Sequence, residues 1–256
     1  MLRFPTIRAA LYLVVMLCVL LLPLPELLFS LSFLAAVLLL CVAEWRLFAK
    51  ADGGAPICPI GVKKDRKRLF LLFAPFELFS LLAAILTALC LALFGISTPE
   101  YPQSFVFFVS AVVLAPLAEE LLCRGLLFRV LSPFGAGWSI FLTALLFSFL
   151  HGSLYQIPYA FLAGLFLGYL REESGSLLYP VLFHAASNLL SFFNIPTPLL
   201  FGIWLPLSVV AVYLLVDRYP IPFPRRKGNR LPLLSLVPIF AFCAVMLLFA
   251  VLSEVL

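Results

Sequence analysis

The chain has 256 residues, of which 64% are hydrophobic and 11% are charged, and its formal net charge is +5. A mean hydropathy of +1.18 excludes a water-soluble globular domain, because a soluble fold could not bury so much apolar surface. The composition predicts an all-α protein, a polytopic membrane bundle of about eight to nine transmembrane helices. We expect residues 1–256 to form a single membrane domain.

Apolar stretches of helix-forming length follow one another along the chain, at 11–24, 27–43, 69–94, 104–131, 138–151, 158–170, 176–193, 198–216 and 231–256. The first follows Arg3 and Arg8, as the apolar part of a signal peptide would. It lacks a small-x-small cleavage site, and a second stretch follows at once, so we expect a retained helix. Helices within 1–95 and 198–256 are expected to flank a central segment at 104–193, for which the motifs below imply the catalytic core.

Basic residues gather in alternate connections, namely 46–68, 124–129, Arg171 and 218–230, whereas 97–103 and 152–156 carry no Lys or Arg. If the chain crosses the membrane once with each helix, all the basic connections fall on one side of the membrane. The positive-inside rule then predicts a cytosolic N-terminus. Topology and contact with membrane lipids account for the positive charge without a nucleic-acid partner. We expect an integral protein of the plasma (inner) membrane in a bacterium, or of the endoplasmic reticulum in a eukaryote.

Ionisable groups, which are rare at membrane depth, occur in three of the central stretches. The chain's two histidines, His151 and His184, lie in apolar runs, and the adjacent Glu119 and Glu120 lie in another. Such groups mark functional sites in membrane proteins. Counting about 1.5 Å of rise per residue places Glu119, His151, His184 and Asn188 roughly 12–20 Å deep, in one shared layer.

Adjacent residues on a helix diverge by about 100°, so Glu119 and Glu120 are expected to have different roles. Glu120 lies four residues before Arg124, the favourable spacing for an ion pair that would make a buried arginine tolerable. Glu119 is then left to face the histidines as a candidate general base. Pro116, three residues before Glu119, is expected to kink the helix and free backbone carbonyls.

Two chemistries fit these residue types. In one, His151, His184 and a glutamate, Glu119, hold Zn²⁺, which converts a bound water into a nucleophile. In the other, Glu119 and a histidine polarise water directly, while His184 and Asn188 donate hydrogen bonds to the oxyanion that develops. The residues alone leave the choice open.

Three motifs occur in order on the apolar helices: E-E-x-x-x-R at 119–124, F-x-x-x-H at 147–151 and H-x-x-x-N at 184–188. In these motifs the chain resembles the CPBP family of intramembrane proteases, also called the ABI or type II CAAX prenyl endopeptidase family. The resemblance covers about residues 104–193. It implies an endopeptidase that cuts membrane-anchored substrates, prenylated CAAX-type tails among them, with or without a metal.

The resemblance also implies roles for individual residues. Glu119 resembles the catalytic carboxylate, His151 and His184 resemble the catalytic histidines, and Asn188 resembles the assisting asparagine. Glu120, Arg124 and Phe147 would be supporting residues. We expect the cut to occur near the cytosolic leaflet.

Other classes of function compete with this interpretation. A proton-coupled transporter could use Glu119, His151 and His184 as a relay, but a relay should continue to the far face, whereas these groups stop in one layer. A family member without activity, acting in bacteriocin immunity or as a scaffold, would need no intact motifs.

Overall fold

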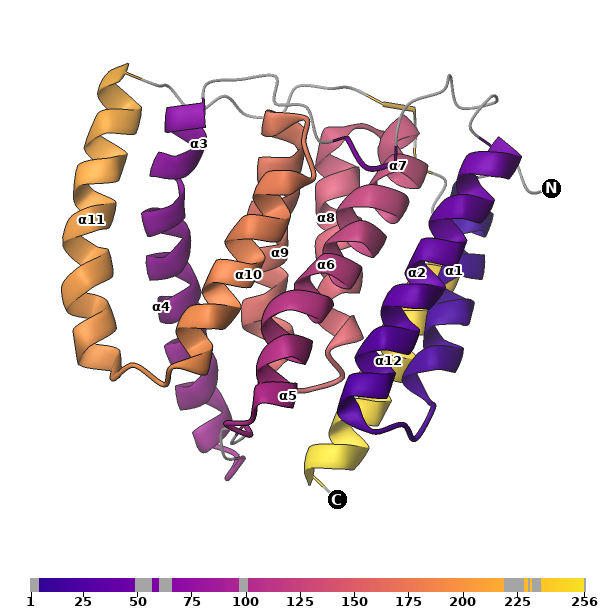
Figure 1. Cartoon of the computed structure of the whole chain (residues 1–256), viewed down its shortest axis with the longest axis horizontal. Helices are drawn as coiled ribbons and strands as arrows, with labels where there is room; N and C mark the ends of the chain where they lie inside the picture. The colour runs from indigo at the N-terminus through magenta and orange to yellow at the C-terminus, as the bar shows by residue number, and fades with distance from the viewer. Residues whose placement is uncertain are drawn as a thin grey trace.

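A computed structural model describes residues 5–48, 57–59, 66–96, 101–218, 228–229, 231 and 236–255. The regular secondary structure of these residues is helical (Figure 1). In chain order the elements are α1 (Pro5–Leu20), α2 (Glu26–Phe48), α3 (Arg66–Leu71), α4 (Phe73–Ala92), α5 (Phe105–Phe108), η1 (Val109–Leu114), α6 (Ala115–Glu120), η2 (Leu121–Leu127), α7 (Phe128–Leu131), η3 (Ser132–Phe134), α8 (Ala136–Leu150), α9 (Gln156–Ser174), α10 (Leu178–Phe192), α11 (Thr197–Arg218) and α12 (Val237–Val255).

The helices run alternately between two faces of the bundle (Figure 1). In the described part of the chain, four helical spans are long and apolar enough to cross a membrane, at Glu26–Phe48, Lys67–Ala92, Phe105–Phe134 and Thr197–Arg218, and α1, α8 and α12 are shorter apolar helices. The prediction of an all-α membrane bundle is therefore confirmed.

One face of the bundle carries the basic helix ends, and we call it the basic face. It lies at the top of Figure 1, where α1 begins, α2 and α11 end, and α7 passes into α8. The described basic residues at these ends are Arg8, Arg46, Lys67, Arg68, Arg129, Arg171 and Arg218. The opposite face is formed by the connections at 21–25, 151–155 and 193–196, which contain no Lys or Arg. Parts of the predicted basic connections, at 49–56, 60–65, 219–227 and 230, lie outside the described residues.

The helix that contains the two glutamates widens into π-helical turns at η1 and η2, on either side of α6. At the end of η1 the Ala115 N–H donates to the Ser110 carbonyl, five residues back. The next carbonyl in this series, that of Ala111, would bond Pro116, which has no N–H. Pro116 therefore cannot donate to the Ala111 carbonyl.

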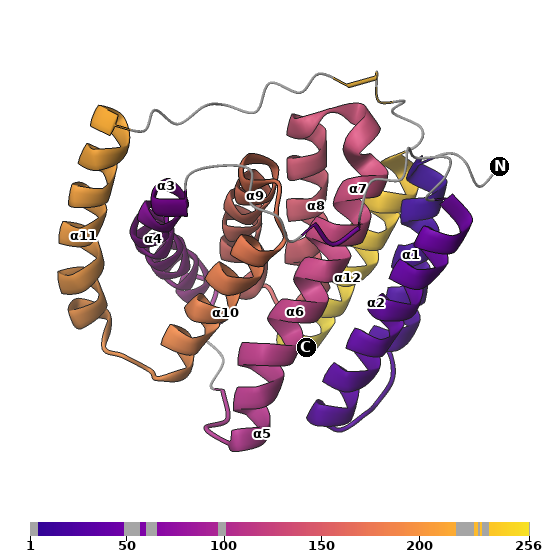
Figure 2. The ribbon, with the colours of Figure 1, turned by 45° about the horizontal axis from the view of Figure 1, so that its top comes forward.

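Small residues bring α9 into close contact with α8. A Cβ added to Gly164 would lie 3.0 Å from the Ala144 Cα, and one added to Gly168 would lie 3.1 Å from the Ile140 Cγ2. Membrane helices commonly pack through such small residues, because the backbones can then approach each other. The α9 backbone thereby comes within reach of the central helix. Turning the molecule shows α12 beside α1 and α8, and α11 beside α4 (Figure 2).

Candidate active site

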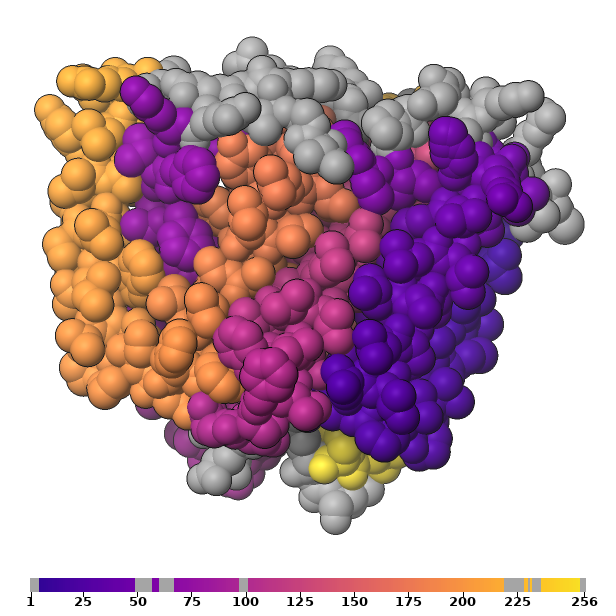
Figure 3. Space-filling view, viewed as in Figure 1, coloured from indigo at the N-terminus to yellow at the C-terminus, as the bar shows by residue number. Residues whose placement is uncertain are grey.

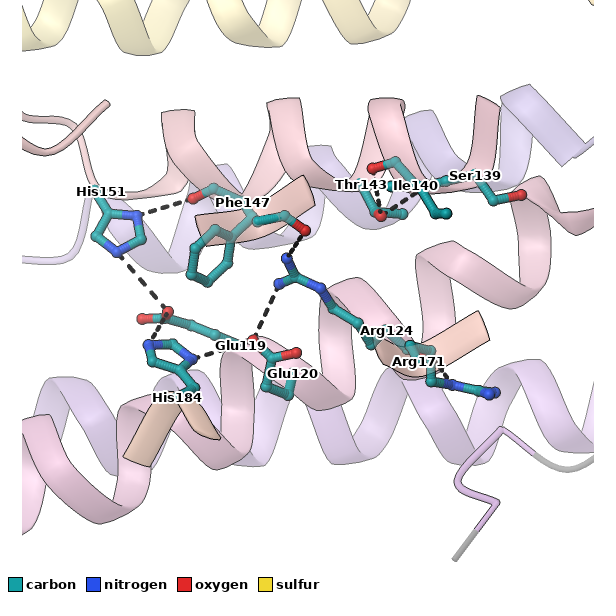
Figure 4. Close-up of polar contacts among 11 residues, drawn as sticks. Glu119, Glu120, Arg124, Ser139, Ile140, Thr143, Phe147, His151, Arg171 and His184 are labelled. Atoms are coloured by element: carbon teal, nitrogen blue, oxygen red, sulfur yellow. Dashed lines mark hydrogen bonds and ion pairs between the residues drawn. The ribbon is translucent and has the colours of Figure 1, made fainter. Parts of the chain in front are cut away.

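Glu119, His151 and His184 meet inside the bundle, although they come from three different helices (Figure 4). The Glu119 Oε2 atom lies 4.0 Å from the His151 Nε2 and 3.8 Å from the His184 Nε2. Glu119 lies on α6, His151 caps the end of α8, and His184 lies within α10. The structure thus brings together the residues that the sequence placed in one layer. The Glu119 Oε2 atom is buried and has no hydrogen-bond partner.

The two imidazole rings present the same nitrogen to Glu119. The His151 Nδ1 lies 2.8 Å from the Phe147 carbonyl, and the His184 Nδ1 lies 3.1 Å from the Glu120 Oε1. Both oxygens are acceptors, so each Nδ1 carries the hydrogen. In the neutral ring Nε2 then keeps its lone pair, and both lone pairs are available beside Glu119.

Glu120 is fully buried and holds two groups at once. Its Oε1 accepts a hydrogen bond from the Arg124 Nη1 at 3.0 Å, which is the pairing that the sequence suggested. The same oxygen accepts from the His184 Nδ1, a contact that sequence reasoning missed. Glu120 therefore connects the arginine to a histidine ring, in the way that a buried carboxylate orients the imidazole of a serine protease triad.

Arg124 is fully buried and is enclosed by further contacts. Its Nη2 donates to the Gly164 carbonyl at 2.8 Å, and its guanidinium lies 4.4 Å from the centre of the Phe147 ring. A side chain at position 164 would crowd this guanidinium, because an added Cβ would lie 3.2 Å from the Nη2. The spacing of Gly164 and Gly168 was the sequence signal that could have predicted this close approach.

Phe147 separates the two histidines. Its ring meets the His151 ring edge-on at 5.0 Å between centroids, and the His184 ring at 5.3 Å. Contacts of this kind fix ring orientation as well as burying apolar area. Phe147 thus contacts both histidine rings.

Asn188 lies on the same helix as His184, and its Nδ2 donates to the Ala111 carbonyl at 2.8 Å. This is the carbonyl to which Pro116 cannot donate. An amide nitrogen has two hydrogens, so one N–H remains for another acceptor. Asn188 also lines a cavity together with Glu119, His151 and His184.

Two cavities meet at Glu119 and His151. The smaller, of about 230 Å³, is lined by polar groups that include Asn188, Ser187 and Tyr101. The larger, of about 630 Å³, is lined mostly by apolar side chains of α1, α2 and α12. Gln156 borders both cavities and donates from its Nε2 to the Tyr101 hydroxyl at 2.8 Å, a pair that the sequence analysis did not foresee.

The chemistry of the donor atoms matches a zinc site with two histidines and one glutamate, but their spacing does not. Ligands bound about 2.0–2.1 Å from a tetrahedral zinc lie about 3.3 Å apart. Here the Glu119 Oε2 is 3.8 and 4.0 Å from the two Nε2 atoms. Within the described residues no group of three or more His, Cys, Asp or Glu side chains is arranged to hold a metal ion. A water with hydrogen bonds of about 2.8 Å in a tetrahedral arrangement would hold its partners about 4.6 Å apart, so the observed distances lie between the zinc and the water geometries.

The fold and the site define an integral membrane protein with carboxylate and imidazole groups gathered inside its helical bundle. A family model described as Type II CAAX prenyl endopeptidase Rce1-like matches residues 101–190, the segment that contains all three motifs. Over this segment the chain is similar to that family of CAAX-type intramembrane proteases. No curated protein and no solved structure matches the chain.

Proposed function

We propose that the protein is an endopeptidase that hydrolyses a peptide bond of a membrane-anchored substrate, with water activated by Glu119 and the histidines. One observation carries the proposal: a buried carboxylate oxygen without a partner faces two imidazole nitrogens at a shared cavity wall. Such an oxygen is costly to bury and is suited to accept a proton from a bound water.

The reaction needs one water and one peptide carbonyl between these groups. Glu119 Oε2 takes a proton from the water, while the His151 Nε2 accepts its second hydrogen and orients the oxygen. The water oxygen bonds to the carbonyl carbon, and the remaining Asn188 N–H stabilises the oxyanion. When the carbon–nitrogen bond breaks, the proton held by Glu119 passes to the leaving nitrogen. His184, kept in place by Glu120, faces the same space through its Nε2.

We propose that this reaction proceeds without a metal. In it Glu119 acts as the base, Asn188 as the oxyanion donor and the histidines as water-orienting groups. Glu120, Arg124 and Phe147 act as positioning residues. Substrates of this family are membrane-associated, and we infer that this chain also takes a membrane-anchored peptide.

The orientation of the chain follows from its basic face. Because the described Lys and Arg residues at helix ends share that face, we infer that it is cytosolic and that the N-terminus lies on the same side. The protein would then reside in the plasma membrane of a bacterium or the endoplasmic reticulum of a eukaryote.

A proton relay fits the site less well. Beyond Glu120 and Arg124, toward the basic face, the central helix is lined by buried apolar side chains such as Leu122, Leu126 and Leu127. A relay needs polar groups or water along its whole length.

The direct test is cleavage of a peptide pool by purified protein in detergent, followed by mass spectrometry. We expect Glu119→Gln and His151→Ala to lower the rate by roughly 10²–10⁴, which is the usual contribution of acid–base catalysis. Glu172→Gln, near the basic end of α9, is the matched control and should cleave like wild type. Full activity in Glu119→Gln would refute the assignment.

A further inference from the structure

The large cavity lies in the half of the bundle away from the basic face, whereas the small cavity runs from that half to the middle of the bundle, where Phe76 and Leu167 line it. The large cavity is bordered by Leu20 and Leu21 where α1 ends, by Glu26 and Phe29 in the first turns of α2, and by Gly152 in the α8–α9 connection. These segments form the opposite face, at the bottom of Figure 1. The small cavity reaches the same face through Tyr101 and Gln156.

The mouth of the large cavity is apolar and exposed. Leu21 on one side is 63% exposed, and Phe249 and Leu252 of α12 on the other side are each 49% exposed. In the space-filling view the end of α12 emerges below the surface formed by α1 and α2, next to α5 (Figure 3). In a membrane this mouth opens laterally, toward lipid, because its rim carries side chains that lipid solvates.

The route from the basic face to Glu119 is closed. Leu122, Cys123 and Leu126, one to two turns beyond Glu119, are fully buried. A short segment, Ile57–Pro59, covers the central helix there, since the Ile57 carbonyl oxygen lies only 3.4 Å from where a Gly125 Cβ would be.

Two hydrogen bonds stabilise this packed layer between Glu119 and the basic face. The Leu177 N–H donates to the Pro59 carbonyl at 2.7 Å. The Arg171 Nε donates to the Arg124 carbonyl at 3.0 Å, beside the π-helical turns of η2. A substrate approaching from the basic side would have to displace this packed layer.

We propose that the substrate reaches Glu119 from the membrane half opposite the basic face, with an apolar peptide segment in the large cavity and the bond to be cut at the junction of the two cavities. The cavities share Glu119 and His151, so a chain lying across both passes the reacting groups. The apolar walls suit apolar side chains, and the polar groups that line the small cavity, Ser187 and Asn188 among them, suit the peptide groups beyond the bond.

This proposal rests on the proposed function and on the cytosolic placement of the basic face. It selects a substrate class, namely peptides whose cleavage site lies in the non-cytosolic leaflet. It also reverses our expectation of a cut near the cytosolic leaflet. Depth along each helix, counted from the basic ends, does not reveal on which side a cavity opens.

The first experiment tests the orientation without using activity. In a variant that keeps only Cys58, a membrane-impermeant maleimide should label intact cells of a bacterial host poorly and permeabilised cells well, since this exposed residue lies at the basic face. A variant with Ser153→Cys as its single cysteine should label in intact cells. The reversed pattern would overturn the proposal.

The second experiment tests the route. A single-span substrate carries the sequence selected from the peptide pool at either its cytosolic or its non-cytosolic end, and both versions are expressed with the protease. We expect cleavage of the non-cytosolic version at a rate roughly tenfold or more above that of the other. Preferential cleavage of the cytosolic version would overturn the route but leave the proposed function standing. If the protease cleaved neither version and also failed to cleave the peptide pool, both the route and the proposed function would be overturned.

A blocking variant completes the test. Ser30 borders the large cavity, and Ser32, two residues on in α2, does not border either cavity. Ser30→Trp should lower kcat/KM roughly tenfold or more, mainly through KM, while Ser32→Trp should leave it unchanged. Equal rates in the two variants would show that the substrate does not pass through this cavity.

Discussion

Replacing Glu120 by Gln tests the two roles of this buried carboxylate, which are to pair with Arg124 and to orient the His184 ring. The change keeps the shape of the side chain but removes the negative charge that accepts from Arg124 at 3.0 Å and from His184 at 3.1 Å. Removing one partner of a buried ion pair costs about 3–5 kcal/mol. Arg124 retains the Gly164 carbonyl and the Phe147 ring, so we expect the lower end, about 3 kcal/mol.

The effect on activity should exceed what lost stability explains. Without the carboxylate, the His184 Nδ1–H loses a charged acceptor and the ring can turn or change tautomer. The corresponding loss in a serine protease triad is about 10⁴ in kcat, and we expect roughly 10²–10⁴ here. Peptide cleavage at a temperature where the variant is folded measures the activity, and thermal unfolding in detergent measures the stability, with an expected fall of roughly 6–12 °C.

A second variant separates stability from positioning. Glu120→Gln combined with Arg124→Met removes the unpaired buried charge, so stability should recover in part while activity stays low. If the double variant regained activity together with stability, Glu120 would serve only to pair with Arg124. Wild-type stability and activity in Glu120→Gln alone would refute the whole reasoning.

The remaining predictions concern the surroundings of the site. Gly164→Ala should cost about 1–3 kcal/mol of stability in the thermal unfolding assay and lower activity, because its Cβ would crowd Ala144 and Arg124. Gly137→Ala is the control: its Cβ would meet nothing within 4 Å, so the change should be neutral or slightly stabilising in that assay. Asn188→Ala should slow cleavage by about 10²–10³ through loss of an oxyanion donor, and undiminished kcat would contradict that role. Pro116→Ala restores an N–H to the Ala111 carbonyl and should lower activity roughly tenfold without loss of stability, whereas Pro206→Ala, inside α11, should not change the rate.

The helices and the local pairs could be predicted from the sequence, because both depend on near neighbours. Apolar runs mark the helices, and the four-residue spacing of Glu120 and Arg124 dictates their contact within one helical turn. The common depth of Glu119, His151 and His184 could also be predicted, since a regular rise per residue converts position into height.

Contacts that depend on helix rotation could not be predicted. The bond between Glu120 and His184 joins positions 64 residues apart, and it forms only because π-helical turns on either side of α6 set the direction of its side chains. Hydrophobic periodicity does not signal such turns. The side on which the cavities open could not be predicted for a similar reason, since it depends on which helix ends separate and which pack together.

The most direct test of the account is the cleavage rate of chelator-treated protein whose metal content has been measured by mass spectrometry, for wild type and Glu119→Gln side by side. If water is activated by Glu119 and the histidines alone, metal-free wild type cleaves at its full rate and Glu119→Gln is slower by roughly 10²–10⁴. Loss of wild-type cleavage on chelation, restored by added zinc, would contradict the mechanism. Equal rates for the two proteins would contradict the assignment of Glu119 as the base.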